Sequence, residues 1–290
     1  MKAGLIGNGI AGSLTPAMHE AEGKAQGLDY SYTRVDTSAQ PWSGMPLAGL
    51  LDEAETAGFS GVNITHPFKV EAAGLADELH GAAQPLDAVN TMVFRDGRRI
   101  GHNTDYAGFR AALARDLADA AFGQVLLVGA GGAGAAVALG LIDHGVGRLV
   151  IHDRAPGAAE DLARHLGETR PRAQGVVAQG AGGIDFAALD GVVNATPVGM
   201  EGHPGTAIDV ARLPKGAWVA DIVYFPLETE LLARARARGH RVMTGAGMAV
   251  FQAVGSFELF TGLGADPARM TAHFDRLQRE KARGREARSA

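Results

Sequence analysis

Residues 124–134 read QVLLVGAGGAG, a short apolar run followed at once by glycines and alanines. Such a run is typical of a strand buried on both faces of a parallel sheet. Gly129, Gly131 and Gly134 form a G-x-G-x-x-G pattern, and a helical segment follows. Alone this pattern is weak, because the chain has 41 glycines and a tight strand-to-helix turn would also explain it. In its strand–helix context it predicts a dinucleotide site, with the pyrophosphate on the first N–H groups of the helix.

The next apolar run, RLVIHD at 148–153, ends in Asp153, about 20 residues after the glycines, where an acidic residue binds ribose hydroxyls. The alternative is a helix cap ahead of Pro156. A 2′-phosphate about 4 Å from this carboxylate would be repelled by roughly 4 kcal/mol at an effective dielectric near 20. We therefore expect NAD, with NADP as the weaker alternative because Arg154 could serve a 2′-phosphate or stack on adenine.

The segments around this unit alternate between strand and helix patterns. Further buried runs at 175–179, 191–196 and 218–223 predict a doubly wound parallel sheet of the Rossmann type. The N-terminal third also alternates, and it includes an expected helix at 67–79, a hairpin over 88–103 and a helix from Tyr106. The predicted fold is α/β with two domains. Residues 1–105 form a substrate-binding and catalytic domain, completed by C-terminal helices in 240–290 that pack back on it, and residues 106–239 form the dinucleotide domain.

Composition narrows the class of protein. The chain has 290 residues, of which 46% are hydrophobic, and its net charge of -5 argues against a nucleic-acid binder. It has no cysteine, hence no disulfide or thiolate metal site, and no apolar run near the roughly 20 residues of a membrane span. We expect a soluble cytoplasmic protein, a monomer or homodimer. No metal is expected, because the histidines lack ligand spacing and fit surface, cap or loop positions: His19, His66, His102 and His203.

The stretch NITHPFK, residues 63–69, carries polar residues that the hydrophobic pattern does not need. Asn63 and Thr65 point to the same side of a strand. Pro67 suits the first turn of a helix, and the positive end of the helix dipole there disfavours Lys69. Lys69 either extends to water, as lysines usually do, or is held at a site.

Several motifs occur in one order along nearly the whole chain: GSLTPAMHE (12–20), NITHPFK, AVNT (88–91), GHNTD (101–105), GAGGAG, NATPVGM (194–200), VYFP (223–226) and MAVFQA (248–253). In this combination the sequence resembles the shikimate dehydrogenase family. SLTPAMHE together with Asp153 is most similar to its NAD-dependent quinate/shikimate dehydrogenase branch. The NADP enzymes more often have a second serine where Thr15 stands and Asn-Arg-Thr where residues 153–155 stand.

The resemblance implies hydride transfer between NAD and the ring secondary alcohol of quinate or shikimate, a reaction of the shikimate pathway of aromatic amino acid biosynthesis. The keto partners are 3-dehydroquinate and 3-dehydroshikimate. By position, Lys69 and Asp105 would be the catalytic pair. The implied substrate-binding residues are Ser13, Thr15, Asn63, Thr65, Lys69, Asn90, Asp105, Tyr224 and Gln252. The implied cofactor-binding residues are Gly129, Ala130, Gly131, Gly132, Ala133, Gly134, Asp153, Arg154, Thr196, Pro197, Val223, Gly245 and Met248.

Some of these residues also have purely structural interpretations. Ser13 and Thr15 fit a turn and a helix cap, and Asp105 fits the N-cap of the helix from Tyr106. A lysine with the ordinary pKa of about 10.4 is a poor base near neutrality. Burial would lower that pKa and a neighbouring Asp105 would raise it, so we assign acid–base work to the pair, with Lys69 transferring the proton.

One departure from the family pattern concerns Thr244-Gly245, where the family often has Asp-Gly; it bears on the nicotinamide and substrate contacts. Within the class, the alternative is an NADP-linked or dual-cofactor shikimate or aminoshikimate dehydrogenase. From a different class, the chain could be a non-catalytic dinucleotide-sensing protein. The Lys69–Asp105 pair argues against a sensor, which needs no proton-transfer groups.

Overall fold

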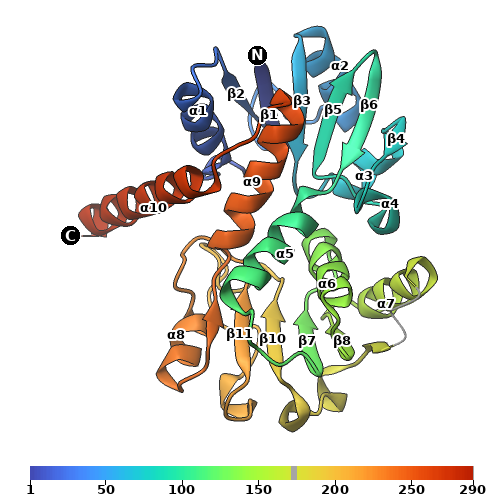
Figure 1. Cartoon of the computed structure of the whole chain (residues 1–290), viewed down its shortest axis with the longest axis vertical. Helices are drawn as coiled ribbons and strands as arrows, with labels where there is room; N and C mark the ends of the chain where they lie inside the picture. Colours follow the sequence, from blue (N-terminus) through green and yellow to red (C-terminus); the bar gives the residue numbers. More distant parts are fainter. Residues whose placement is uncertain (171–174, 290) are drawn as a thin grey trace. The chain divides into compact units, whose positions relative to one another are not determined.

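The computed structural model describes residues 1–170 and 175–289, with side chains up to residue 283. The chain divides into two compact units (Figure 1). Unit 1 contains Met1–Thr104 and Val250–Ala290, and unit 2 contains Asp105–Ala249.

Unit 1 is built on a mixed sheet with the strand order β2-β1-β3-β5-β6-β4. Strands β1, β2 and β3 run parallel, and β5 runs antiparallel to both β3 and β6. Asp96 (φ 53) and Gly97 (φ 71) make the β5–β6 turn in the left-handed region that a two-residue hairpin turn requires. The strands are β1 Lys2–Gly7, β2 Ser31–Asp36, β3 Phe59–Ile64, β4 Glu78–Leu79, β5 Thr91–Arg95 and β6 Arg98–His102.

The helices of unit 1 come from both ends of the chain, as predicted. In Figure 1 the C-terminal helix α10 lies beside α1, and the Arg269 guanidinium on α10 binds the buried carboxylate of Glu22 on α1 at 2.7 Å. A core between the sheet and its helices contains Ile6, Leu47, Leu51 and Val62. The helices are α1 Thr15–Ala25, α2 Leu47–Thr56, α3 Lys69–Gly74, α4 Ala83–Leu86, α9 Ala246–Thr261, which enters unit 1 at Val250, and α10 Pro267–Ser289.

The expected helix at 67–79 is wrong in its extent. Pro67 lies in a turn outside the helix, α3 covers only Lys69–Gly74, and β4 follows. The N–H groups of Asp77 and His80 donate to the carbonyls of Arg99 and Gly101, each at 2.8 Å. Pairing with the edge of β6 therefore outcompetes continuation of the helix.

Unit 2 is a parallel sheet with the order β12-β11-β10-β7-β8-β9. The chain enters at β7 in the middle, proceeds outward through β8 and β9, and then returns to the other side of β7. This reversal is the switch point of a doubly wound fold, which confirms the predicted Rossmann-type sheet. The strands are β7 Gln124–Val128, β8 Arg148–His152, β9 Val176–Ala178, β10 Gly191–Asn194, β11 Trp218–Asp221 and β12 Val242–Met243.

The helices that accompany this sheet are α5 Thr104–Asp116, α6 Gly132–His144, α7 Ala158–Thr169 and α8 Glu230–Ala237. Leu126, Val150, Val192 and Val219, one from each of four central strands, are buried in its core. Of the helices in the described part of the chain, none has the length and apolar character to cross a membrane.

Candidate functional site

The glycine loop of unit 2 joins β7 to α6, and its three motif glycines differ in what surrounds them. Gly129 has φ +107, a left-handed conformation that favours glycine. A Cβ on Gly134 would lie 2.0 Å from the Gly129 carbonyl oxygen, so only glycine allows this contact. A Cβ on Gly131 would meet no described atom within 4 Å, and its surroundings are thus open on the side where a pyrophosphate would approach. The first N–H groups of α6, those of Gly132 and Ala133, have no partner within the helix and suit an anion.

Asp153 follows β8 and faces this loop. Its Oδ2 accepts from the N–H of Ala130 at 2.7 Å, and its Oδ1 accepts from the N–H of Ala155 at 2.8 Å. Helix α7 begins only at Ala158, with Gly157 at its N-cap, so the helix-cap alternative for Asp153 is wrong. Asp153 stays half-buried and Arg154 is exposed, which leaves both available to a ribose and its substituents.

Two buried polar residues that the sequence did not single out support the next loops. Asn194, at the end of β10, accepts through Oδ1 from both the N–H and the hydroxyl of Thr196, at 3.0 and 2.7 Å. Its Nδ2 donates to Asp221 Oδ1 at 3.0 Å, and Asp221 also accepts from the Val223 N–H at 3.0 Å and from the Thr229 hydroxyl at 2.7 Å. Burial raises the pKa of Asp221 to about 6. This network fixes the segments that carry Thr196, Pro197 and Val223.

The remaining cofactor candidates lie near the end of unit 2. A Cβ on Gly245 would lie 2.4 Å from the Ile222 carbonyl oxygen and 2.5 Å from that of Val223, so the β12–α9 junction approaches the β11 loop too closely for any other residue. Met248 is buried in the first turn of α9. Tyr224, a substrate candidate, follows Val223 and is 37% exposed.

In unit 1, Ser13 and Thr15 lie where the loop from β1 meets helix α1. Ser13 Oγ accepts from the Thr15 N–H at 3.3 Å, and Thr15 is the first residue of α1. Helix α1 has no side-chain cap, so the cap interpretation of Thr15 is wrong, although Ser13 does stabilise the turn. Both side chains are half-buried.

Asn63, on β3, is held by three protein groups. Its Oδ1 accepts from the Tyr32 hydroxyl at 2.6 Å, and its Nδ2 donates to the Asn90 carbonyl at 3.3 Å and the Thr91 hydroxyl at 2.9 Å. Both amide hydrogens are used, which leaves a lone pair of Oδ1 for a substrate hydroxyl. Tyr32 is buried, and burial raises its pKa well above the ordinary value. Tyr32 is thus a supporting residue that the sequence did not indicate.

Asn90 connects β5 to the start of α5. Its Oδ1 accepts from the Thr104 N–H at 2.7 Å and from the Thr91 hydroxyl at 3.0 Å, and its Nδ2 donates to the Thr104 hydroxyl at 3.0 Å. The Asn90 amide thereby fixes the residue that precedes Asp105. Helix α5 begins at Thr104, so Asp105 lies inside its first turn and is not its N-cap. Asp105 is buried, and the helix dipole favours a carboxylate at this position.

The other substrate candidates of unit 1 are half-buried. Thr65 follows β3, and its N–H donates to the Ile6 carbonyl at 2.9 Å. Lys69 begins α3, and its carbonyl accepts from the Val89 N–H at 2.8 Å. Gln252 lies in α9.

These residues collect at one edge of the unit 1 sheet. The carboxyl ends of the parallel strands β1 and β3 meet there, and β5 begins there because it is antiparallel to β3, with Asn63 opposite Thr91. The structure thus brings together, within unit 1, the candidates Ser13, Thr15, Asn63, Thr65, Lys69 and Asn90. Asp105 and Tyr224 belong to unit 2.

The expectation for His19 is wrong, because its side chain is fully buried in unit 1. Its Nδ1 lies 3.0 Å from the Tyr30 hydroxyl and its Nε2 lies 3.2 Å from the Ser256 hydroxyl. Burial lowers its pKa to about 3, so the ring is neutral and joins α1 to α9 as a packing residue. Within the described ranges, no group of three or more His, Asp or Glu side chains could hold a metal ion.

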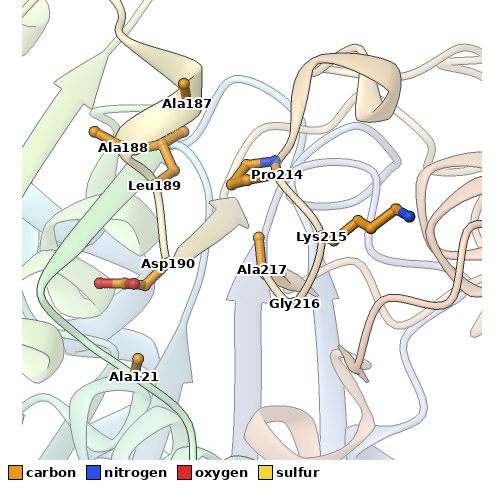
Figure 2. A pocket seen from close by; sticks show the side chains of 9 residues that line it. All are labelled: Ala121, Ala187, Ala188, Leu189, Asp190, Pro214, Lys215, Gly216 and Ala217. Atoms are coloured by element: carbon orange, nitrogen blue, oxygen red, sulfur yellow. The ribbon is translucent and has the colours of Figure 1, made fainter.

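A cavity of about 360 Å³ lies elsewhere in unit 2, lined by residues 187–190 and 214–217 and by Ala121 (Figure 2). These residues precede β10 and β11, so the cavity lies at the amino ends of the strands, whereas dinucleotides bind at the carboxyl ends. In Figure 2 the charged ends of Asp190 and Lys215 point in opposite directions. The cavity does not belong to the candidate site.

Comparison with known proteins identifies relatives of this chain. The profile of the shikimate dehydrogenase substrate binding domain matches residues 5–92. The quinate/shikimate dehydrogenase (NAD(+)) of Corynebacterium efficiens is 50% identical over 274 residues, covering 93% of this chain and 96% of that protein. A shikimate dehydrogenase (NADP(+)) of Pseudarthrobacter chlorophenolicus is 46% identical over 279 residues, covering 93% of each chain.

Comparison with solved structures also finds a dehydrogenase of quinate. The solved structure of quinate dehydrogenase from Corynebacterium glutamicum in complex with NAD matches with a TM-score of 0.90 and 49% identity, covering 94% of this chain and 98% of that one. The similarity extends through both units, in sequence and in structure. The chain therefore belongs to the shikimate dehydrogenase family.

Proposed function

We propose that this protein is an NAD-dependent dehydrogenase that oxidises the ring secondary alcohol of quinate or shikimate and reduces the corresponding 3-dehydro ketone in reverse. The observation that carries the proposal is the collection of hydroxyl, amide and ammonium groups at one edge of the unit 1 sheet. A cyclic polyhydroxy acid needs such a set, with hydroxyls for its carboxylate and amides for its ring hydroxyls. The relatives named for quinate and shikimate support the substrate class.

In the proposed reaction the hydroxyl-bearing carbon loses a hydride and the hydroxyl oxygen loses a proton, giving a ketone. NAD, when bound, supplies the hydride acceptor. Lys69 and Asp105 handle the proton as a coupled pair, with Lys69 taking it from the hydroxyl during oxidation and returning it to the ketone oxygen during reduction. Asn90 holds the backbone of Thr104, the residue before Asp105, and Asn63 offers its remaining lone pair to a neighbouring ring hydroxyl.

The cofactor preference follows from Asp153. The residues of unit 2 fit a dinucleotide, because the glycine loop is open at Gly131 and Asp153 is bonded to that loop through Ala130. The Asp153 carboxylate would accept hydrogen bonds from ribose hydroxyls and would repel a 2′-phosphate. The NAD named with the Corynebacterium relatives supports this assignment.

A turnover assay with quinate, shikimate and an aminoshikimate, each with NAD and with NADP, tests the proposal. We expect the highest kcat/KM with NAD and either quinate or shikimate. A preference for NADP would contradict the cofactor assignment, and preferred turnover of the amino analogue would contradict the substrate class. NAD binding without turnover of any substrate would indicate a dinucleotide sensor. We further propose that the enzyme works in the cytoplasm as a monomer or homodimer, which suits a metabolic enzyme of small polar substrates.

A further inference from the structure

Arg34 lies on the same face of the unit 1 sheet as Asn63. Strand β1 separates their strands, and Leu5 is in register with Arg34 of β2 on one side and with Asn63 of β3 on the other. Residues in register on neighbouring strands project from the same face of a sheet. Arg34 therefore belongs to the face that carries the proposed substrate residues.

The guanidinium of Arg34 contacts the loop of the proposed carboxylate site. Its Nη2 donates to the Ser13 carbonyl at 3.2 Å. Its Nε is buried, and in the described part of the chain it has no hydrogen-bond partner. No acidic side chain among those described lies within ion-pair distance of Arg34. A half-buried arginine with an unused buried donor and no counter-ion calls for an explanation.

The next acidic residue on this face is Asp36, but its carboxylate binds groups of the β1–α1 loop and Ser38, not Arg34. Its carboxylate accepts from the N–H groups of Gly9 and Ile10, each at 2.9 Å, and from the hydroxyl of Ser38 at 2.7 Å. Asp36 thus holds the β1–α1 loop in place, and the Arg34 charge remains uncompensated by an ion pair.

We propose that Arg34 provides the positive charge for the substrate carboxylate, next to the hydroxyls of Ser13 and Thr15. This inference rests on the proposed function. Two neutral hydroxyls can bind carboxylate oxygens, but they leave the negative charge uncompensated in a half-buried site. An arginine presents several N–H donors in a rigid fork that suits a carboxylate. Arg34 would then select for acids against the corresponding esters.

The test compares shikimate with its methyl ester, which lacks the negative charge. Arg34→Gln removes the charge but keeps an amide that can donate to the Ser13 carbonyl. We expect kcat/KM for shikimate to fall about tenfold, mainly through KM, as for one charge-assisted contact at a half-exposed site. For the ester it should change less than about twofold. Arg34→Lys, which keeps a charge, should restore most of the preference for the acid.

Lys2→Gln is the matched control. Lys2 is the first residue of β1 and so lies at the end of that strand away from the candidate site. Its Nζ donates to the Ala57 carbonyl at 3.0 Å. Its loss should leave the acid-to-ester ratio unchanged. Equal losses on acid and ester in Arg34→Gln would overturn the proposal, because Arg34 would then only support the Ser13 loop. An unchanged ratio with no loss on either substrate would overturn it as well.

Calorimetric binding of shikimate separates this inference from the proposed reaction. If the wild type turns over neither substrate, the proposed reaction fails, and Arg34 is then judged by affinity alone. Weaker binding of shikimate by Arg34→Gln, with the ester unaffected, would still support the carboxylate role. Equal affinities, or no binding by the wild type, would overturn it.

Discussion

Asp221 should make the stability of unit 2 depend on pH. Burial raises its pKa from the ordinary 3.8 to about 6. The folded protein therefore binds this proton more tightly than the unfolded chain, and the free energy of unfolding falls as the pH rises from about 4 to about 6. A shift of about two pKa units corresponds to roughly 3 kcal/mol, of which roughly 2 kcal/mol is lost between about pH 4.5 and 7.5.

The substitution Asp221→Asn isolates this group. The amide oxygen can still accept from Asn194 and Val223 and its nitrogen can donate to the Thr229 hydroxyl, so the network is kept without a charge. Urea unfolding is followed by the fluorescence of the buried Trp218 in the same strand, in a Trp42→Phe background, because the chain has only 2 tryptophans.

The measured quantity is the free energy of unfolding of the wild type minus that of the variant, across the pH range. We expect this difference to fall by roughly 2 kcal/mol between about pH 4.5 and 7.5. Asp209→Asn, which removes an exposed carboxylate of the same unit, is the control for loss of one charge. A difference that does not vary with pH would refute the assignment of a raised pKa to Asp221.

Three further predictions concern the candidate site. Asp153→Ala should reduce the preference for NAD over NADP, measured as the ratio of kcat/KM values, and an unchanged ratio would remove the attribution to Asp153. Thr15→Ser should shift the quinate-to-shikimate ratio, because quinate has a hydroxyl on the carbon that bears its carboxylate; equal loss on both would mean that Thr15 only anchors the carboxylate. Tyr32→Phe leaves Asn63 Oδ1 without its buried donor and should lower stability by roughly 1–3 kcal/mol. It should also raise the KM for quinate but not that for NAD, whereas unchanged stability and KM would contradict a supporting role for Tyr32.

The parts of the fold that depend on local sequence could be predicted. Gly129 has a left-handed backbone conformation and Gly134 packs against the Gly129 carbonyl five residues before it, so their spacing alone indicates the turn. The hairpin at Asp96 and Gly97 and the buried strand 124–128 are local features of the same kind. The position of Asp153 next to the glycine loop follows from the regular geometry of a βαβ unit.

Features that depend on distant partners could not be predicted. Residues 75–79 continue a helical pattern, but Glu78 and Leu79 pair with β6 as strand β4, and nothing local signals this. His19 is polar in sequence, yet Tyr30, just before β2, and Ser256, on α9, supply its partners and allow its burial. Asn194 and Asp221 end two apolar strands, which is a signal that could have identified them, but their mutual hydrogen bond is visible only in the fold.

The central claim is that Lys69 transfers the proton, and the kcat of Lys69→Met with NAD and quinate or shikimate tests it most directly. Methionine keeps most of the side-chain volume, so chemistry is separated from packing, and Lys24→Met on the exposed face of α1 controls for loss of a lysine. We expect kcat to fall by about 10²–10⁴, with NAD binding and thermal stability near those of the wild type. Turnover close to that of the wild type, or a raised KM with kcat preserved, would contradict the role of Lys69 as the proton-transfer group.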